Sequence, residues 1–206
     1  MKAIVLKNGI LAEEIISSLE GKGIEVTAVS KADDIDESRF ADGLDLLVLT
    51  TGEKDYELSD GAFGEGRDYD GLVSYLSERL IERHYVIEKC IPLLEKGKLK
   101  RFAFAEYRDG SVSDNHDTEG FAYHMIQAQM NMHAKILHEN YRLRRTEDKF
   151  TVRCFAAERD ADERKKGISA ADYMLLDFSS DDRYDPKHYE ENLLKLRDHY
   201  FVEIPW

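Results

Sequence analysis

The stretch "KAIVLKNGILAEEIISSLEGKGIEVTAV", Lys2–Val29, decides the fold class. Its opening apolar run at 2–6 ends at Asn8-Gly9, as a short buried strand does. Apolar residues then recur at helical spacing over 10–22, where glycines end the helix. The apolar run at 24–29 predicts a second strand. A strand–helix–strand unit of this kind opens a parallel α/β sheet.

The same alternation continues along the rest of the chain. Strands are predicted at 44–52, 99–106 and 149–157, and helices at 72–95, 120–145, 170–178 and 186–199, before an extended tail. We therefore predict an α/β fold in which residues 1–206 form a single Rossmann-type domain, a doubly wound parallel sheet with helices on both faces. Ligands of such sheets bind where strands end at the carboxyl edge, so we expect a small ligand in a crevice there.

The charge balance narrows the range of partners. The chain has 29 Lys and Arg against 42 Asp and Glu, a formal charge of −13. This sign repels phosphate backbones and anionic lipid. We therefore expect neither a nucleic-acid partner nor a membrane partner.

Cysteine and histidine usage points to an intracellular protein without a metal centre. Cys90 and Cys154 lie in apolar segments without metal-like spacing, which favours two reduced, buried thiols over a disulfide. The apolar run at the N-terminus is too short for a signal peptide. The histidines lack the paired spacing of a zinc site. The expectation is a cytoplasmic protein that holds no metal.

Five segments, taken in order, resemble one family of reductases. They are "LDLLVLTTG" (44–52), "IPLLEKGK" (91–98), "GSVSDN" (110–115), "AYHMIQAQMNMHAKIL" (122–137) and "FVEIPW" (201–206). Together they resemble the short-chain dehydrogenase/reductase family, in particular its small carbonyl-reductase-like branch, over nearly the whole chain. The resemblance implies a Rossmann fold, NADP or NAD as cofactor, and a homodimer or tetramer formed through the helices at 72–95 and 120–145.

The resemblance also assigns the positions that would contact a cofactor. They are Asn8, Gly9, Ile10, Ser30, Lys31, Thr50, Thr51, Gly52, Tyr123, Gln127 and Ala157. The family's phosphate loop has three glycines, whereas "LKNGILAEE" has one, and Glu13 and Glu14 are expected in the first helical turn, where they repel a diphosphate. Ser30 and Lys31 after the second strand favour the 2′-phosphorylated cofactor.

The catalytic positions of the family are largely replaced. Its tyrosine is retained as Tyr123, but its lysine is Gln127, its serine is Tyr107 preceded by Glu106, and its asparagine falls at or next to Arg79. The lysine normally lowers the tyrosine pKa from about 10 towards working pH. A glutamine carries no charge, so Tyr123 should keep its proton, and a nearby Glu106 would strengthen that tendency. Arg79 could supply the missing charge if it reached the crevice.

Three hypotheses follow. The first is a non-redox or weakly active protein that either binds a nucleotide or another small ligand or has a regulatory role. The second is an active NAD(P)-dependent oxidoreductase for a small carbonyl or alcohol, with altered catalytic residues. The third is a structural subunit of a hetero-oligomer. We favour the first, because the phosphate loop and the catalytic positions depart from the family pattern together.

Overall fold

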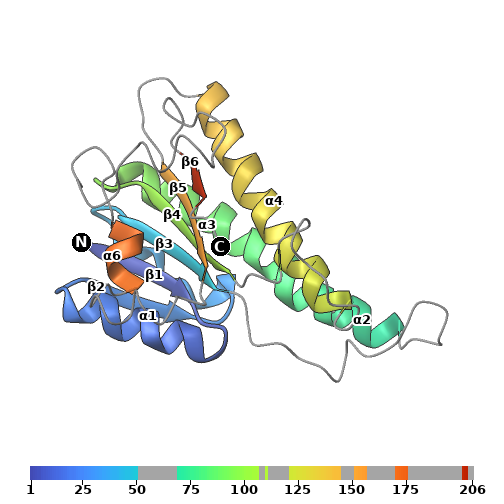
Figure 1. The fold of residues 1–206 in the computed structure, drawn as a ribbon. Helices are drawn as coiled ribbons and strands as arrows, with labels where there is room; N and C mark the ends of the chain where they lie inside the picture. Colours follow the sequence, from blue (N-terminus) through green and yellow to red (C-terminus); the bar gives the residue numbers. More distant parts are fainter. Residues whose placement is uncertain are drawn as a thin grey trace, which may run out of the picture.

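A six-stranded parallel sheet forms the centre of the molecule (Figure 1). The computed structural model describes residues 1–50, 69–106, 110, 121–144, 151–156, 170–175 and 201–203. The strands are β1 (Lys2–Leu6), β2 (Glu25–Val29), β3 (Leu46–Thr50), β4 (Arg101–Glu106), β5 (Thr151–Ala156) and β6 (Phe201–Glu203). Their spatial order is β2-β1-β3-β4-β5-β6. The predicted parallel α/β sheet is confirmed.

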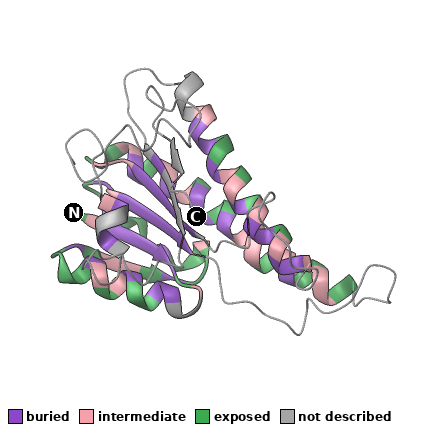
Figure 2. Ribbon diagram, in the orientation of Figure 1, coloured by how far each residue is buried: buried purple, intermediate pink, exposed green. Residues whose placement is uncertain are grey.

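Helices cover both faces of this sheet. They are α1 (Gly9–Gly21), α2 (Tyr69–Leu76), η4 (Ser77–Ile81, a π-helical turn), α3 (Glu82–Lys96), α4 (Phe121–Arg144) and α6 (Ala170–Leu175). One buried cluster joins α3 and α4 to the sheet, and a second joins α1 and α6 to the opposite face. Between them, β3 is buried at every position and β1 at every position after Lys2, whereas the edge strand β2 is buried only at Val29 (Figure 2). The doubly wound arrangement with helices on both faces is therefore confirmed.

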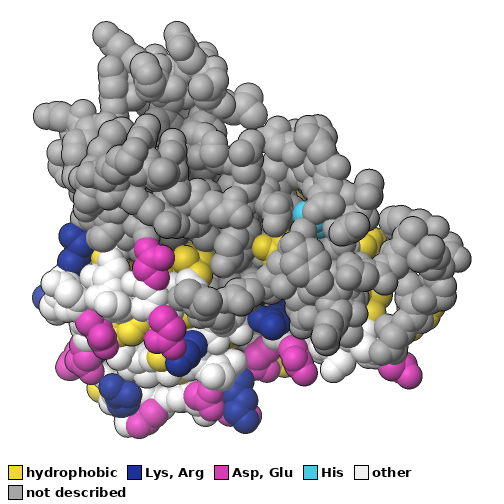
Figure 3. Space-filling view, turned by 60° about the horizontal axis from the view of Figure 1, so that its bottom comes forward, with side chains coloured by type: hydrophobic (Ala, Val, Ile, Leu, Met, Phe, Trp, Pro, Cys, Tyr) yellow, Lys and Arg dark blue, Asp and Glu magenta, His cyan; other side chains and the backbone are white. Residues whose placement is uncertain are grey.

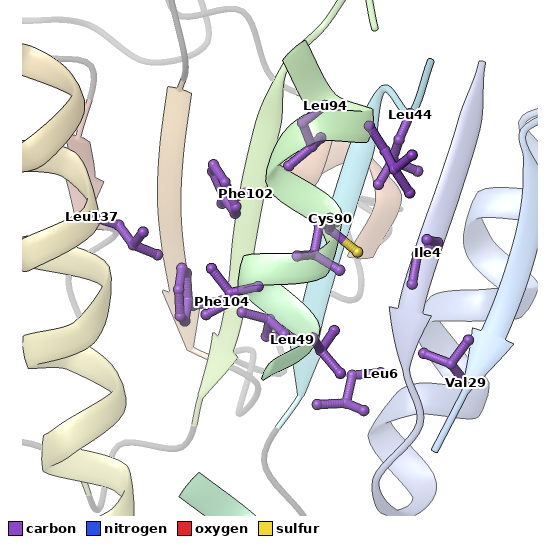
Figure 4. Close-up of a cluster of buried hydrophobic side chains, with 14 of the residues drawn as sticks. Ile4, Leu6, Val29, Leu44, Leu49, Cys90, Leu94, Phe102, Phe104 and Leu137 are labelled. Carbon is purple, nitrogen blue, oxygen red and sulfur yellow. The ribbon is translucent and has the colours of Figure 1, made fainter. Parts of the chain in front are cut away.

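The alternation of side chains along β3 explains how one strand serves both layers. Leu47 and Leu49 belong to the cluster under α3 and α4, whereas Leu46 and Val48 belong to the cluster under α1. Successive residues of a strand point to opposite faces, so a strand buried on both sides is apolar at every position. Figure 4 shows the first cluster, in which Cys90 projects from α3 among the side chains of the sheet.

Most predicted elements are found within a few residues of their expected ends. The chain between β2 and β3 adds two short 3₁₀ turns that were not predicted, η1 (Ala32–Asp34) and η2 (Glu37–Phe40). The helix predicted at 72–95 begins at Tyr69 and contains the π-helical turn η4. The helix predicted at 186–199 lies outside the described residues.

The described surface carries charges of both signs. On the side turned forward in Figure 3, which carries α1, acidic and basic side chains are intermixed. Among the described helices, none is both long enough and apolar enough to cross a membrane.

Candidate functional site

The carboxyl edge of the sheet gathers the strand ends at one level. In the parallel register Leu6 lies beside both Val29 and Leu49, and Thr50 lies beside Ala105. Strand order reverses between β1 and β3, and such a switch point is where α/β sheets bind ligands. The carboxyl ends of β1, β2 and β3 therefore lie at the same edge, as predicted.

Asn8 and Thr50, two of the predicted positions, meet at the switch point. The Asn8 backbone N–H donates to Thr50 Oγ1 at 3.2 Å, and Asn8 Nδ2 donates to the Thr50 carbonyl oxygen at 3.4 Å. Thr50 Oγ1 in turn donates to the Leu6 carbonyl oxygen at 2.8 Å. Because Thr50 is fully buried, these bonds hold the turn after β1 against the end of β3.

Arg83 joins the same network from α3. Its Nη2 donates to the Thr50 carbonyl oxygen at 2.7 Å, and the residue is only 2% exposed. A buried guanidinium therefore stands at the carboxyl edge, beside the switch point. Burying a cation is costly, so its place in the core calls for a reason beyond packing.

The sequence interpretation missed Arg83, although a signal for it was present. The buried face of α3 includes Val86, Ile87, Cys90 and Leu94, and Arg83 is one helical turn before the first two. A basic residue in register with an apolar stripe is a candidate for a buried charge. Alignment to the family's asparagine drew attention to Arg79 instead.

Arg79 lies in the π-helical turn η4 and has a different neighbour. Its guanidinium carbon is 5.6 Å from the centre of the Tyr75 ring, a distance at which a cation and an aromatic face attract. Arg79 is half-buried rather than buried. The cation that the structure places at the end of β3 is thus Arg83.

Tyr123 and Gln127 lie one turn apart on α4, as the sequence predicted, and both are buried. Tyr123 is 3% exposed and Gln127 is 0% exposed. Gly110 packs directly on this part of the helix. A Cβ atom at Gly110 would lie 2.9 Å from the Gln127 carbonyl carbon, and Asn131 Nδ2 donates to the Gly110 carbonyl oxygen at 3.3 Å. The amide that replaces the family's lysine is therefore enclosed by the chain.

The end of β2 is occupied by a carboxylate. Asp34 Oδ2 accepts the backbone N–H groups of Ser30 at 2.9 Å and of Lys31 at 3.1 Å. The side chains of Ser30 and Lys31, both predicted cofactor contacts, are exposed.

The turn between β1 and α1 differs from the prediction in one respect. The helix begins at Gly9, so its first turn contains no acidic residue, contrary to the expectation for Glu13 and Glu14. The prediction placed the helix start too late. Glu13 forms an ion pair with Lys7 at 2.5 Å, which offsets its charge near the turn. Ile10, like Gly9, lies in the first turn of α1, and the structure does not describe its side chain.

Several predicted positions cannot be placed in this network. Tyr107, Thr51, Gly52 and Ala157 lie outside the described residues, and Glu106 ends β4 without a described side chain. Among the described residues, no cluster of three or more His, Cys, Asp or Glu side chains could hold a metal ion.

Comparisons with known proteins identify the fold. No protein-family model and no curated protein matches the chain. A structure described as a short-chain alcohol dehydrogenase from Burkholderia multivorans aligns with a TM-score of 0.61 at 12% identity, covering 81% of this chain and 87% of that chain. One described as the carbonyl reductase Sniffer of Caenorhabditis elegans aligns with a TM-score of 0.61 at 16% identity, covering 75% and 84%.

A third aligned structure contains a nucleotide. It is described as a short-chain dehydrogenase/reductase from Burkholderia multivorans with bound NADP, and aligns with a TM-score of 0.58 at 13% identity, covering 75% of this chain and 78% of that chain. The fold of this chain is thus the Rossmann-type α/β fold of short-chain dehydrogenase/reductases.

Proposed function

We propose that this short-chain dehydrogenase/reductase-type Rossmann fold serves as a binding or regulatory protein that takes an adenine dinucleotide or a related small ligand and performs no efficient redox chemistry. The carboxyl edge of the sheet, at the switch point between β1 and β3, is the proposed binding site. The single observation that carries the proposal is the enclosed Gln127, one turn after Tyr123.

The chemistry at Tyr123 depends on a positive charge close to its hydroxyl group. A phenol has an ordinary pKa of about 10, and an adjacent ammonium makes it a competent proton donor and acceptor near neutral pH. Gln127 offers an amide oxygen and an amide nitrogen but no charge. An amide at this position can form hydrogen bonds but gives no help to proton transfer.

The residues at the switch point suit a nucleotide in part. The first turn of α1 starts at Gly9, without an acidic side chain, and backbone N–H groups at a helix start favour an anionic group. The Asn8–Thr50 bonds fix the turn that precedes this helix. A dinucleotide bound here would supply hydride chemistry in a complete enzyme. The residues of this chain would only hold and orient it.

Binding and turnover can be measured separately. NADH and NADPH are titrated into the protein by calorimetry, and oxidation of the cofactor is followed with a panel of small carbonyl compounds. The proposal predicts saturable binding without turnover above background. Tyr123→Phe should then leave the rate of cofactor oxidation at the same background level, because the phenol transfers no proton.

A second candidate function is an active NAD(P)-dependent oxidoreductase with altered catalytic residues. The observation in its favour is Arg83, a buried cation bonded to the end of β3. In this case Arg83 would provide a positive charge at the carboxyl edge, in place of the family's lysine, which is Gln127 here. Turnover that is lost both in Tyr123→Phe and in Arg83→Met, with cofactor affinity retained, would establish this reading over the first.

We also propose that the two long helical segments form a contact between subunits. Most of the large exposed apolar side chains of the described residues lie there: Tyr69, Val73, Ile81 and Tyr85 on α2, η4 and α3, and Met125, Met132 and Ile136 on α4. Figure 1 shows α2 and α4 running side by side beyond the end of the sheet, and Tyr75, Ala122 and Ile126 pack between them. The proposed assembly is a homodimer or tetramer. A structural role in a mixed oligomer would use the same surface.

A further inference from the structure

Two histidine rings meet between helices α3 and α4. The centre of the His84 ring on α3 lies 5.6 Å from the centre of the His133 ring on α4, and the two ring planes are inclined by 32°. His84 is exposed, whereas His133 is half-buried, and the Phe104 ring of β4 lies 6.3 Å from the His133 ring. The pair therefore extends from the surface into the junction of the two helices.

The groups around this pair favour the uncharged form of His133. Burial lowers the pKa of His133 below its ordinary value of 6.5, and the charges of His84 and Arg83 add to this effect. Glu88 opposes it, and its Oε1 lies 3.8 Å from His84 Nε2. The described side chains that β4 and β5 contribute to the adjoining cluster are apolar. A proton added to the pair therefore meets other positive charges and one exposed carboxylate.

The same two helical segments carry exposed apolar side chains, which form the surface of the proposed subunit contact. Ile81 lies three residues before His84, and Ile136 lies three residues after His133. Both apolar side chains are exposed. Residues three apart share a side of a helix, so each histidine lies in line with an exposed apolar residue. The histidine pair is thus part of the proposed contact surface.

A second copy of the chain is the partner that this surface fits. The chain has a formal charge of −13, and 34% of its residues are charged, yet residues 121–134 of α4 contain no Asp, Glu, Lys or Arg. Two copies repel each other through their net charge, so they approach most easily through a surface without charges. A basic partner would instead be drawn to the acidic side chains. In a symmetric contact, each copy brings its own histidine pair to the interface.

We propose that pH controls the contact between two copies, and that protonation of the His84–His133 pair separates them. This inference rests on the subunit contact proposed above and names the regulation of that contact. In the contact, the second copy covers the pair and removes water from it, which disfavours the charged form of an imidazole. The separated chains therefore bind more protons than the assembly does, and association weakens as pH falls below about 6.5.

The net charge of the chain predicts the opposite trend. The sequence pI is about 5.0, so acidification from neutral pH removes negative charge and reduces the general repulsion between copies. Net charge alone would therefore strengthen association in mild acid. The sign of the pH dependence distinguishes the histidine pair from this general effect.

Sedimentation equilibrium of the full chain at two pH values tests the proposal. Each proton taken up on separation weakens association by up to about tenfold per pH unit, so the dissociation constant of the wild type should rise at least about tenfold between about pH 7.5 and about pH 6. His84→Gln combined with His133→Gln should remove most of this change. His124→Gln removes an imidazole that lies 5.7 Å from the Tyr123 ring, between ring centres, and should keep the change. Circular dichroism at both pH values checks that the chains stay folded.

The possible outcomes separate the regulation from the contact. Association of the wild type that is unchanged or tighter at the lower pH, or an equal pH dependence in the double variant, overturns the role of the histidines and leaves the contact standing. A wild type that is monomeric at both pH values overturns the contact, and the inference with it. Where the double variant does not fold or does not associate, His84→Gln alone is measured, because His84 is exposed. It should reduce the change in log Kd by about half, and full retention of the change would contradict the proposal.

Discussion

Two residues decide the charge near Tyr123 and the carboxyl edge of the sheet. Gln127 is uncharged, as the non-redox proposal requires, and Arg83 is a buried cation that the sequence analysis did not predict. Gln127 on α4 is fully buried next to Gly110, whereas Arg83 donates to the Thr50 carbonyl oxygen from α3, on the same face of the sheet. The positive charge at the carboxyl edge therefore comes from Arg83 on α3, and not from a lysine at position 127 as the family resemblance implies. Whether Arg83 compensates for Gln127 is decided by turnover, as set out above.

Cys90 is predicted to be inert in the folded protein. It is buried in the main cluster, and burial raises the pKa of its thiol to about 12, with Lys89 acting in the opposite direction. Since the thiolate is the reactive form, a maleimide should label Cys90 only after denaturation. Mass spectrometry of the labelled peptides distinguishes it from Cys154. Rapid labelling of Cys90 under native conditions would contradict the packing of α3.

His133 is predicted to make the protein less stable in mild acid. Its ring lies 5.6 Å from that of His84 and 6.3 Å from that of Phe104. Burial lowers the His133 pKa below its ordinary 6.5, and the charges of His84 and Arg83 add to this effect while Glu88 opposes it. As pH falls below 6.5, the unfolded chain takes up a proton before the folded chain does. The stability present at higher pH is therefore lost until the folded-state pKa is passed.

Urea unfolding at pH values on either side of 6.5 measures this effect. The free energy of unfolding should fall less steeply with decreasing pH in His133→Gln than in the wild type. His124→Gln, on the same helix, serves as the control. An identical pH dependence in wild type and His133→Gln would show that the buried imidazole does not contribute.

Among single residues, the element on which a residue lies was easier to predict than its hydrogen-bond partners. Tyr123, Gln127, Asn8 and Thr50 were located from motif order, and the structure describes all four at the expected elements. Asp34 was not predicted, because its role depends on a 3₁₀ turn with no strong sequence pattern. A side chain that reaches back to the backbone of its own turn leaves no periodic signal.

At the scale of elements, the chain's apolar periodicity predicted strands β1 to β5 and every long helix that the structure describes, whereas β6 (Phe201–Glu203) was expected only as part of an extended tail. It did not predict the π-helical turn η4 within the helix at 72–95, because a single inserted residue alters the phase without interrupting the apolar pattern. The turn shifts the register between α2 and α3. Tyr69 and Val73 are four residues apart before the turn, and Ile81, its last residue, is four residues before Tyr85 on α3.

The junction between α3 and β3 is predicted to tolerate no side chain at Gly97. A Cβ atom there would lie 1.8 Å from the Leu44 carbonyl oxygen, and Gly43, which faces it, has a φ of +107°. Gly97→Ala should lower the free energy of unfolding by about 3 kcal/mol or more, because backbone has to move. Gly21→Ala, at the end of α1, is the matched control: its Cβ meets nothing within 4 Å, and we expect a change within about 1 kcal/mol. Equal effects of the two substitutions would refute the close approach.

At the scale of the whole molecule, sheet order and layers follow from the strand–helix alternation, whereas the assembly does not. The predicted subunit contact came from the family resemblance alone, and the exposed apolar side chains of α2, η4, α3 and α4 are its physical support. Met125, Met132 and Ile136 are spaced at seven and four residues, so they share one side of α4.

A double substitution tests the assembly. We expect the wild type to sediment as a dimer or tetramer at micromolar concentration, and Met132→Glu with Ile136→Glu to sediment as a monomer of unchanged secondary structure. Ser17→Glu on the exposed side of α1 should have no effect. A wild type that is monomeric at high concentration would contradict the contact.

The most direct measurement of the central claim uses one sample in two steps. NADH is first titrated to saturation by calorimetry, and the absorbance of the reduced nicotinamide is then followed after addition of small aldehydes, ketones and quinones. The account predicts a defined stoichiometry of binding and no loss of reduced nicotinamide beyond that in buffer. Oxidation that is faster than in buffer and is abolished in Tyr123→Phe would show that the phenol transfers protons despite Gln127, and the non-redox account would be wrong.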